Sequence, residues 1–293
     1  MSAPCWAAVA QPSEPTILAG LTRRAGDLTW APLGPRLCEA HPNRSSMKSD
    51  RNDPSQFVAR VLPSGYVLDR SRPLSSQIYR LVREAVVTMQ LHPMDVIFER
   101  VLAEMLGISR TPVREALLQL AREELVLIAA QSGTFVAPVR RDQFIESALI
   151  RRVLETASIR RAAEIIEYKE IEQLRTIHDA HRRAVARDDA IAAIFHDNAF
   201  HATVTGAARL PKVSQLVEMA RAPIDRVRHI TVRDPSVGQM TLSQHQAVLD
   251  ALVSHDADAA ERALQAHLDE AFERQQKEFD ARIELFEGTE GSS

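Results

Sequence analysis

The sequence predicts a mainly α-helical protein with two folded domains, and three observations support this prediction. The chain has 293 residues, of which 45% are apolar, and this is enough to bury a core in each of two ordinary domains. Over residues 74–139, helical spacing of apolar residues gives way to two short β-prone runs. Beyond Arg140 the spacing is helical throughout, and Gly206 and Gly238 are the only glycines before Phe286. We therefore expect a small helical domain that ends in a hairpin, followed by an all-α domain.

Composition and charge exclude several classes of protein. The net charge of −3 excludes a strongly basic coat for nucleic acid, so any DNA-binding surface must be local. Both cysteines, Cys5 and Cys38, lie near the N-terminus, which excludes a disulfide framework in the folded part. The sequence has neither an apolar run of membrane-spanning length nor a secretion signal. These features predict a cytoplasmic protein.

The two ends of the chain are expected to be disordered. Residues 1–65 are predicted to form a disordered leader, because the first 60 or so residues hold seven of the 15 prolines and show no sustained apolar period. Met47 could be the biological start, and a partner-binding arm is the functional alternative. Residues 287–293 are expected to form a disordered tail. The folded domains should then span residues 66–139 and 140–286.

The first folded domain should contain three helices and a hairpin. Apolar residues recur on one helical face over residues 74–90, and a second short period stops at Gly107, a residue suited to the left-handed position that closes a helix. A third helix follows and runs to about Glu124. The β-prone runs at 125–128 and 134–136 then predict the hairpin.

The third helix is the candidate DNA-reading element. Its apolar stripe faces inward, which turns Arg110, Thr111 and Arg114 outward at the amino-terminal end. Helix ends of this kind enter the major groove, where a guanidinium group can bond bidentately to guanine. The alternative is a helical hairpin with two surface arginines, because residues 72–139 carry equal numbers of basic and acidic residues.

The same region carries a long motif, LAEMLGISRTPVREAL, at residues 102–117. This motif resembles the signature of the GntR family of bacterial transcription regulators, whose amino-terminal domain is a winged helix-turn-helix. The resemblance covers residues 72–139 and includes a wing-like run at 132–136. One departure is Glu124, where the family usually has a glycine before the wing. The resemblance implies a base-reading role for Arg110, a wing-tip position for Gly133 and DNA contacts for Arg100, Ser109, Thr111 and Arg114.

The second domain should contain six helices, all defined by the period of their apolar residues. Pro223 is expected to kink or split the fourth of them. The expected ranges are 142–167, 170–186, 189–205, 210–231, 241–254 and 257–285.

Four side chains of the second domain are candidate metal ligands. Asp197 and His201 are one helical turn apart, so a carboxylate and an imidazole project from one face and can share a cation. His245 and His267 lie on the apolar faces of their helices and point into the bundle, where an unpaired imidazole is costly. The alternatives are an ordinary surface pair for the first two residues and satisfied core histidines for the others.

The order and spacing of these residues are similar to those of the FCD effector domain in the FadR-type branch of the GntR family, over residues 142 to about 285. The resemblance implies an all-α helical bundle that binds a divalent metal, with a small carboxylate effector completing the coordination. Zn²⁺, Ni²⁺, Co²⁺ and Mn²⁺ all suit these ligand types. The resemblance also implies that Arg151 faces the effector. Arg152 could take this role instead, and the alternative is that both arginines are exposed to solvent. The implied metal ligands are Asp197, His201, His245 and His267.

Together these features predict a ligand-responsive transcription regulator, not an enzyme. The expected partners are double-stranded operator DNA, a small carboxylate effector and a second copy of the chain, with no membrane involved. We expect the protein to be a repressor whose repression is relieved when the carboxylate effector binds. When bound to DNA, the protein would be associated with the bacterial nucleoid. Two alternatives stay open: a metal-dependent hydrolase or lyase, because such a metal can activate water, and a regulator whose metal is purely structural.

Overall fold

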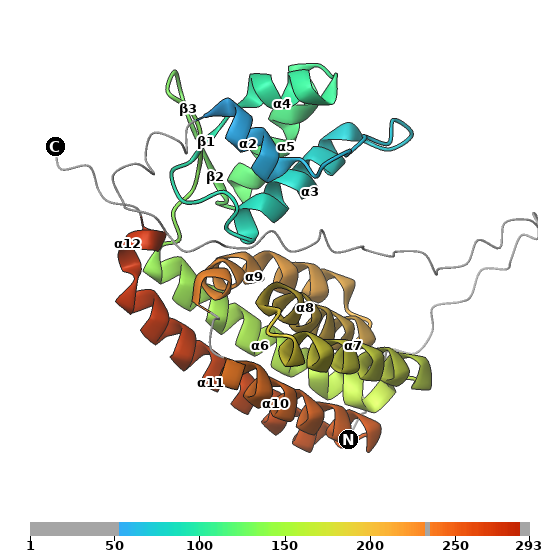
Figure 1. Cartoon of the computed structure of the whole chain (residues 1–293). Helices are drawn as coiled ribbons and strands as arrows, with labels where there is room; N and C mark the ends of the chain where they lie inside the picture. The colour runs from blue at the N-terminus through green and yellow to red at the C-terminus, as the bar shows by residue number, and fades with distance from the viewer. Residues whose placement is uncertain (1–52, 232–234, 288–293) are drawn as a thin grey trace, which may run out of the picture. The chain divides into compact units, whose positions relative to one another are not determined.

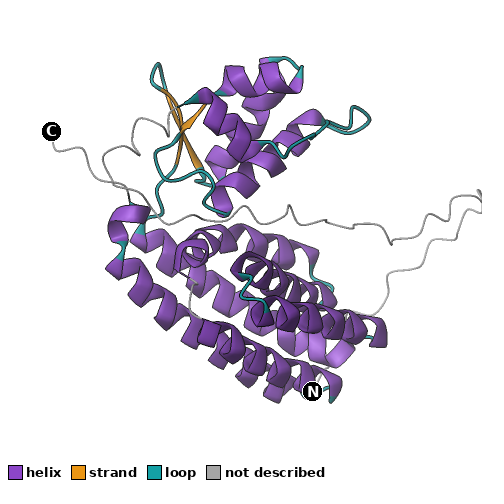
Figure 2. Cartoon of the chain, in the orientation of Figure 1, coloured by secondary structure: helices purple, strands orange, loops and turns teal. Residues whose placement is uncertain are grey.

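The computed structural model of the protein describes residues 53–231 and 235–287. Its helices and strands group into a small domain with a three-stranded sheet and an all-helical domain (Figures 1 and 2). The helices of the small domain are α2 (Pro54–Val61), α3 (Leu74–Val87), α4 (Glu99–Leu106) and α5 (Arg110–Arg122). Its strands are β1 (Val96–Ile97), β2 (Val126–Ala129) and β3 (Gly133–Val136).

Helix α2 corrects the predicted boundary of the disordered leader. Asp53 caps the helix by accepting a hydrogen bond from the backbone N–H of Ser55 at 2.9 Å, and Pro54 occupies the first turn. Phe57 is fully buried and packs edge-on against Phe98. The prediction of disorder up to residue 65 is therefore wrong for this segment. An eight-residue helix with two buried side chains is too short to show a sustained apolar period.

The remaining predictions for the chain ends concern residues that the structure does not describe. The rest of the leader, the Met47 start, Cys5 and Cys38 all lie outside the described residues. So does the predicted tail, apart from Glu287.

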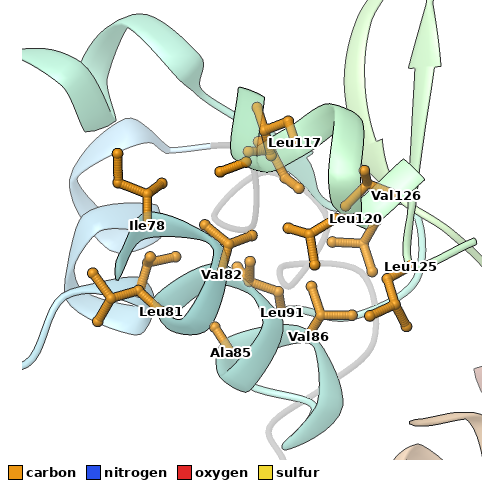
Figure 3. Close-up of a cluster of buried hydrophobic side chains, with 14 of the residues drawn as sticks. Ile78, Leu81, Val82, Ala85, Val86, Leu91, Leu117, Leu120, Leu125 and Val126 are labelled. Atoms are coloured by element: carbon orange, nitrogen blue, oxygen red, sulfur yellow. The ribbon is translucent and has the colours of Figure 1, made fainter. Parts of the chain in front are cut away.

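The core of the small domain forms where α3 and α5 pack against each other and against the sheet (Figure 3). The helical periodicity predicted these inward faces. Each fully buried aliphatic side chain contributes about 1.5–3 kcal/mol. The labelled core residues are Ile78, Leu81, Val82, Ala85, Val86, Leu91, Leu117, Leu120, Leu125 and Val126.

The sheet has the order β1-β3-β2 with antiparallel pairing, so the predicted hairpin is confirmed. Strand β1 was not predicted, because two residues show no alternating pattern and their partners lie almost forty positions further along the chain. Glu124 precedes the wing with a φ of 55°, in the left-handed region that favours glycine. Glu124 therefore adopts a backbone conformation that a glycine would adopt without strain.

The helical domain contains six long helices among the described residues, followed by the short α12 (Ile283–Phe286). Helix α9 runs unbroken past Pro223, so the helix is not split there. Side chains on both sides of the proline are buried and hold the two halves in one helix. The six are α6 (Arg141–Ile165), α7 (Tyr168–Ala186), α8 (Ala190–Ala207), α9 (Pro211–Thr231), α10 (Pro235–Val253) and α11 (Ala257–Ala281).

Packing of these helices brings parts of the sequence that are far apart to one place. Helix α6 lies against α8, α9 and α11, while α10 lies against α7 and α11. Gly238 lets α10 approach α7 closely, since a Cβ atom there would lie 2.9 Å from the methyl groups of Val185. The inner faces of α6, α8, α10 and α11 therefore converge, and they carry the polar residues described next.

Candidate functional site

The four predicted metal ligands meet in one buried cluster, which we call the histidine cluster: Asp197, His201, His245 and His267. One ligand-capable atom from each residue lies within 4.8 Å of the corresponding atoms of the others. All four side chains are buried. The α8 turn places Asp197 and His201 on one face, as the i, i+4 spacing predicted, and α10 and α11 each supply one histidine.

Second partners orient two of the imidazole rings. His201 donates a hydrogen bond from Nδ1 to Oε2 of Glu155 at 2.6 Å, and His267 donates one from Nδ1 to Oε1 of Gln244 at 2.8 Å. These bonds leave the Nε2 lone pairs of both rings facing the interior of the cluster, with the two Nε2 atoms 3.2 Å apart. Two nitrogens that bind one zinc ion at about 2.1 Å lie roughly 3.0–3.4 Å apart, so this spacing fits a shared metal.

His245 provides the second test of whether a metal fits. Its ring is fully buried and stacks on Phe200, with the ring centroids 4.2 Å apart. Within the described part of the chain, neither of its ring nitrogens has a hydrogen-bond partner. A buried polar atom without a partner costs about 1–3 kcal/mol. A cation in the cluster would satisfy this ring, and the donor set of three imidazoles and one carboxylate suits a divalent transition metal.

Burial and neighbouring charges set the protonation of the cluster. Burial lowers the pKa of His267 to about 3 and holds the pKa of His245 well below its usual value. Burial alone would raise the pKa of Asp197, but Arg228 at 2.8 Å and the nearby histidines hold it well below its usual value. The rings are therefore neutral and the carboxylate is ionised at neutral pH, as metal ligands must be.

Arg151 lies in the buried part of the site, whereas its competitor Arg152 lies outside it. The Arg151 guanidinium pairs with Glu155 at 2.5 Å and is 5% exposed. Arg152 is exposed and pairs with Asp269. Burial would raise the pKa of Glu155, but Arg151 and His201 lower it below its usual value, so Glu155 is an ionised acceptor for His201.

A pocket of about 40 Å³ opens beside the histidine cluster. At about 10–15 Å³ for each enclosed water, this volume holds about three water-sized groups. Arg151, Asp197 and His267 line it together with residues that the sequence did not indicate as functional. Those additional polar residues are His181, Arg228, Thr241, Arg274 and Gln275.

Sequence reasoning missed the residues that support the cluster. The role of Glu155 could have been predicted in part, because Glu155 follows Arg151 by one helical turn and the two side chains could form an ion pair. No sequence pattern predicted the roles of Gln244 and Arg228, since these roles depend on contacts between helices. Two further histidines of the helical domain, His196 and His255, lie outside the cluster.

The candidate DNA-reading residues lie together on the small domain. Arg110 and Arg114 project from the first turns of α5, and both reach Glu99 at the start of α4, at 3.5 and 3.2 Å. Thr134 of β3 donates a hydrogen bond to the same carboxylate at 2.9 Å. Glu99, another residue missed from the sequence, thus holds both of these arginines beside Thr134 of β3. The predicted residues Arg100, Ser109, Arg110, Thr111, Arg114 and Gly133 are all exposed.

These features define a class of protein: a winged helix-turn-helix with outward arginines, joined to a helical domain with a buried cluster of one aspartate and three histidines. Comparison with family models agrees with this description. Residues 74–136 match the bacterial regulatory proteins of the gntR family, and residues 146–270 match the FCD domain. The chain belongs to the GntR family, in the FadR-type subfamily that carries an FCD domain.

Several known proteins are similar to this chain. The HTH-type transcriptional repressor RspR of Escherichia coli is 32% identical over 206 residues, which cover 70% of this chain and 90% of RspR. The putative L-lactate dehydrogenase operon regulatory protein of E. coli is 28% identical over 218 residues, covering 67% of this chain and 84% of that protein. The structure of E. coli McbR/YncC shares the fold, with a TM-score of 0.65 at 21% identity, over 70% of this chain and 98% of that one.

These relatives settle the class of activity. The chain is a DNA-binding transcriptional regulator, and the alternative of a hydrolase or lyase is wrong, because the matched family and the curated relatives are transcriptional regulators. No helix within residues 53–231 and 235–287 is long and apolar enough to span a membrane.

Proposed function

We propose that this regulator is a repressor that acts as a homodimer and whose helical domain binds a divalent metal and a small carboxylate effector. One observation carries the metal and effector part of the proposal. His245 is buried, and among the described residues neither of its ring nitrogens forms a hydrogen bond, although Oδ1 of Asp197 lies 3.5 Å from Nε2. Three other side chains bring their ligand atoms to the same point. An apolar core residue of the same size would avoid this cost, so the ring is best explained by a bound cation.

The residues of this chain would divide the work at the site. The histidine cluster would hold the metal, which when bound supplies an open coordination position for a carboxylate. Glu155 and Gln244 would keep His201 and His267 in the orientation that presents Nε2. Arg151 lines the adjoining pocket and would attract the anion. One relative is named for an L-lactate dehydrogenase operon, and lactate is a small carboxylate, which agrees with this class of effector.

The small domain would bind operator DNA through α5. In a homodimer, two copies of α5 would read half-sites of a palindrome, spaced about 34 Å or a multiple of it. Arg110 would read bases, Arg100 and Arg114 would support it, and Ser109 and Thr111 would contact phosphates. Effector binding would shift the helical domains and change the separation of the two reading helices, which relieves repression. Since its partner is chromosomal DNA, we place the protein in the cytoplasm and on the nucleoid.

Metal content tests the first part of the proposal. We expect the purified full-length protein to carry about one divalent ion per chain, measured by inductively coupled plasma mass spectrometry. His245→Ala should lose the ion, because one of four ligands is removed. His255→Asn is the matched control, since His255 is exposed, lies outside the cluster and has a positive φ that asparagine tolerates. Full metal content in the His245 variant would place the ion elsewhere.

A thermal-shift series tests the effector. Lactate and butyrate are added to the protein with and without a metal chelator. A ligand at 100 times its dissociation constant adds about 2.7 kcal/mol, which is several degrees for a domain of this size. Stabilisation that disappears with the chelator supports a metal-assisted effector pocket. Destabilisation by the chelator without any response to acids favours the alternative of a purely structural metal.

A further inference from the structure

The fully buried charges around the pocket beside the histidine cluster balance one another. Three buried arginines surround the site, and three buried carboxylates face them, so this fully buried set is neutral in sum. Arg228 pairs with Asp197 and Asp225, and Arg151 pairs with Glu155. The arginines are Arg151, Arg221 and Arg228, and the carboxylates are Glu155, Asp197 and Asp225. Any further positive charge in the pocket therefore has no carboxylate of its own.

Arg274 of α11 supplies such a charge. It lines the pocket and is half-buried, and it forms no ion pair with any of the residues that the structure describes. Partial burial lowers the pKa of Arg274 and Arg228 lowers it further, while Glu270 and Asp197 raise it. Glu270 is exposed and accepts a hydrogen bond from Gln244 instead. The guanidinium of Arg274 is thus available to an anion from outside the chain.

Arg151 offers a second free donor in the same pocket. Its Nε is used by Glu155, but its Nη2 is buried and, within residues 53–231 and 235–287, has no hydrogen-bond partner. A buried, unpaired guanidinium N–H is costly unless a ligand satisfies it. The pocket therefore contains two separate guanidinium groups that can each bind an anionic oxygen.

The spacing along α11 places Arg274 on the same helical face as His267 of the histidine cluster. His267, Ala271 and Arg274 follow at i, i+4 and i+7, so they lie on the same helical face. Side chains on a helix lean toward its N-terminus, which directs Arg274 back over Ala271 toward His267. The small Ala271 side chain leaves room between them, and Ala193, Ile194 and Val237 add apolar lining. A ligand with a carboxylate at each end of a short aliphatic linker matches this order of features: the histidine cluster, the apolar lining and then Arg274.

We propose that the effector is a small dicarboxylate, with one carboxylate at the histidine cluster beside Arg151 and the second bound by Arg274. This inference rests on the proposed carboxylate effector and makes its class specific. A divalent metal in the cluster adds two positive charges to a neutral buried set, and Arg274 adds a third. A dianion offsets two of these charges and a monoanion only one, and uncompensated charge is costly in a poorly solvated pocket.

The test compares acids that differ only in the second carboxylate. Isothermal titration calorimetry of the full-length, metal-loaded protein measures succinate against butyrate and glutarate against valerate. We expect each diacid to bind about 10 to 100 times more tightly than its matched monoacid, as a charge-assisted hydrogen-bond pair predicts. Arg274→Gln should reduce this preference to about twofold or less without changing monoacid affinity, whereas Arg274→Lys should retain part of it because the charge remains.

The matched control is Arg262→Gln, since Arg262 is an exposed arginine of the same helix that does not line the pocket. It should keep the full preference for diacids. Equal binding of diacid and monoacid by the unmodified protein would overturn the second anion subsite while leaving the proposed function intact. A preference that survives in Arg274→Gln would overturn the assignment to Arg274. If no acid of either kind binds, the proposed effector function itself fails, and this inference fails with it.

Discussion

Nδ1 of His201 lies 2.6 Å from Oε2 of Glu155, and both side chains are completely buried. The contact joins α8 to α6 and determines which ring nitrogen of His201 carries the proton. Because Glu155 accepts at Nδ1, the lone pair on Nε2 points toward His245 and His267. A residue that never touches the cluster's interior thus decides how one of its ligands is presented.

The first prediction concerns this contact. Glu155→Gln keeps the shape of the side chain but removes the charge that orients His201 and neutralises Arg151. Loss of an outer partner of a metal ligand weakens metal affinity by about 10- to 100-fold. Competition with a metal-binding dye would measure the change. Glu164→Gln, an exposed glutamate on the same helix, is the control. Unaltered affinity in Glu155→Gln would show that Glu155 does not position His201.

The second prediction concerns the reading helix. Arg110→Ala should cost about 1–3 kcal/mol of operator-binding free energy per half-site, because a bidentate contact to a base is lost. Fluorescence anisotropy with labelled operator DNA measures this loss, and metal content should stay unchanged. Arg122→Ala, at the exposed far end of α5, should have a small effect. Similar affinities for both variants would mean that the amino-terminal end of α5 does not read the operator.

A third prediction follows from Glu99, which holds Arg110 and Arg114. Glu99→Gln removes an anion from the predicted DNA-binding surface and releases both arginines. The affinity for non-specific DNA should therefore increase by more than the affinity for operator DNA. Exposed pairs of this kind contribute up to about 1 kcal/mol, which predicts a loss of specificity of up to about fivefold. The readout is the ratio of affinities for operator and random DNA. Glu115→Gln on α5 controls for charge alone, and an equal change in it would remove the role assigned to Glu99.

The fourth prediction concerns backbone strain at Glu124. Its φ of 55° costs an L residue about 1–2 kcal/mol, so Glu124→Gly should stabilise the small domain by about 1 kcal/mol after the larger chain entropy of glycine is subtracted. Chemical denaturation of the full-length protein, monitored by hydrogen exchange of the amides in α5 and the wing, measures the gain in the free energy of unfolding. Glu115→Gly, in the middle of α5, should instead lose about 1 kcal/mol. Destabilisation by Glu124→Gly would mean that the glutamate makes contacts worth more than the strain.

Much of the architecture could be predicted from the sequence, because it depends on local periodicity. The apolar spacing predicted α3, α5 and the helices of the bundle, and Gly107 closes α4 in the left-handed conformation as expected. The failures were short elements. Helix α2 and strand β1 are too brief for a periodic signal, and each is held by partners elsewhere in the chain, such as Phe98 for Phe57.

The sequence by itself determined the two-domain class, from the change in apolar spacing near Arg140. It also determined the outward arginines of α5 and the shared helical face of Asp197 and His201, since these follow from spacing within one helix. Only the tertiary structure decided that Arg151 and not Arg152 enters the pocket. Adjacent residues on a helix point about 100° apart, and the packing of α6 against α8 and α11 selects which of them is buried. The same packing brings Gln244 to His267 and Arg274 to the pocket, because these contacts join side chains from helices that no local pattern relates.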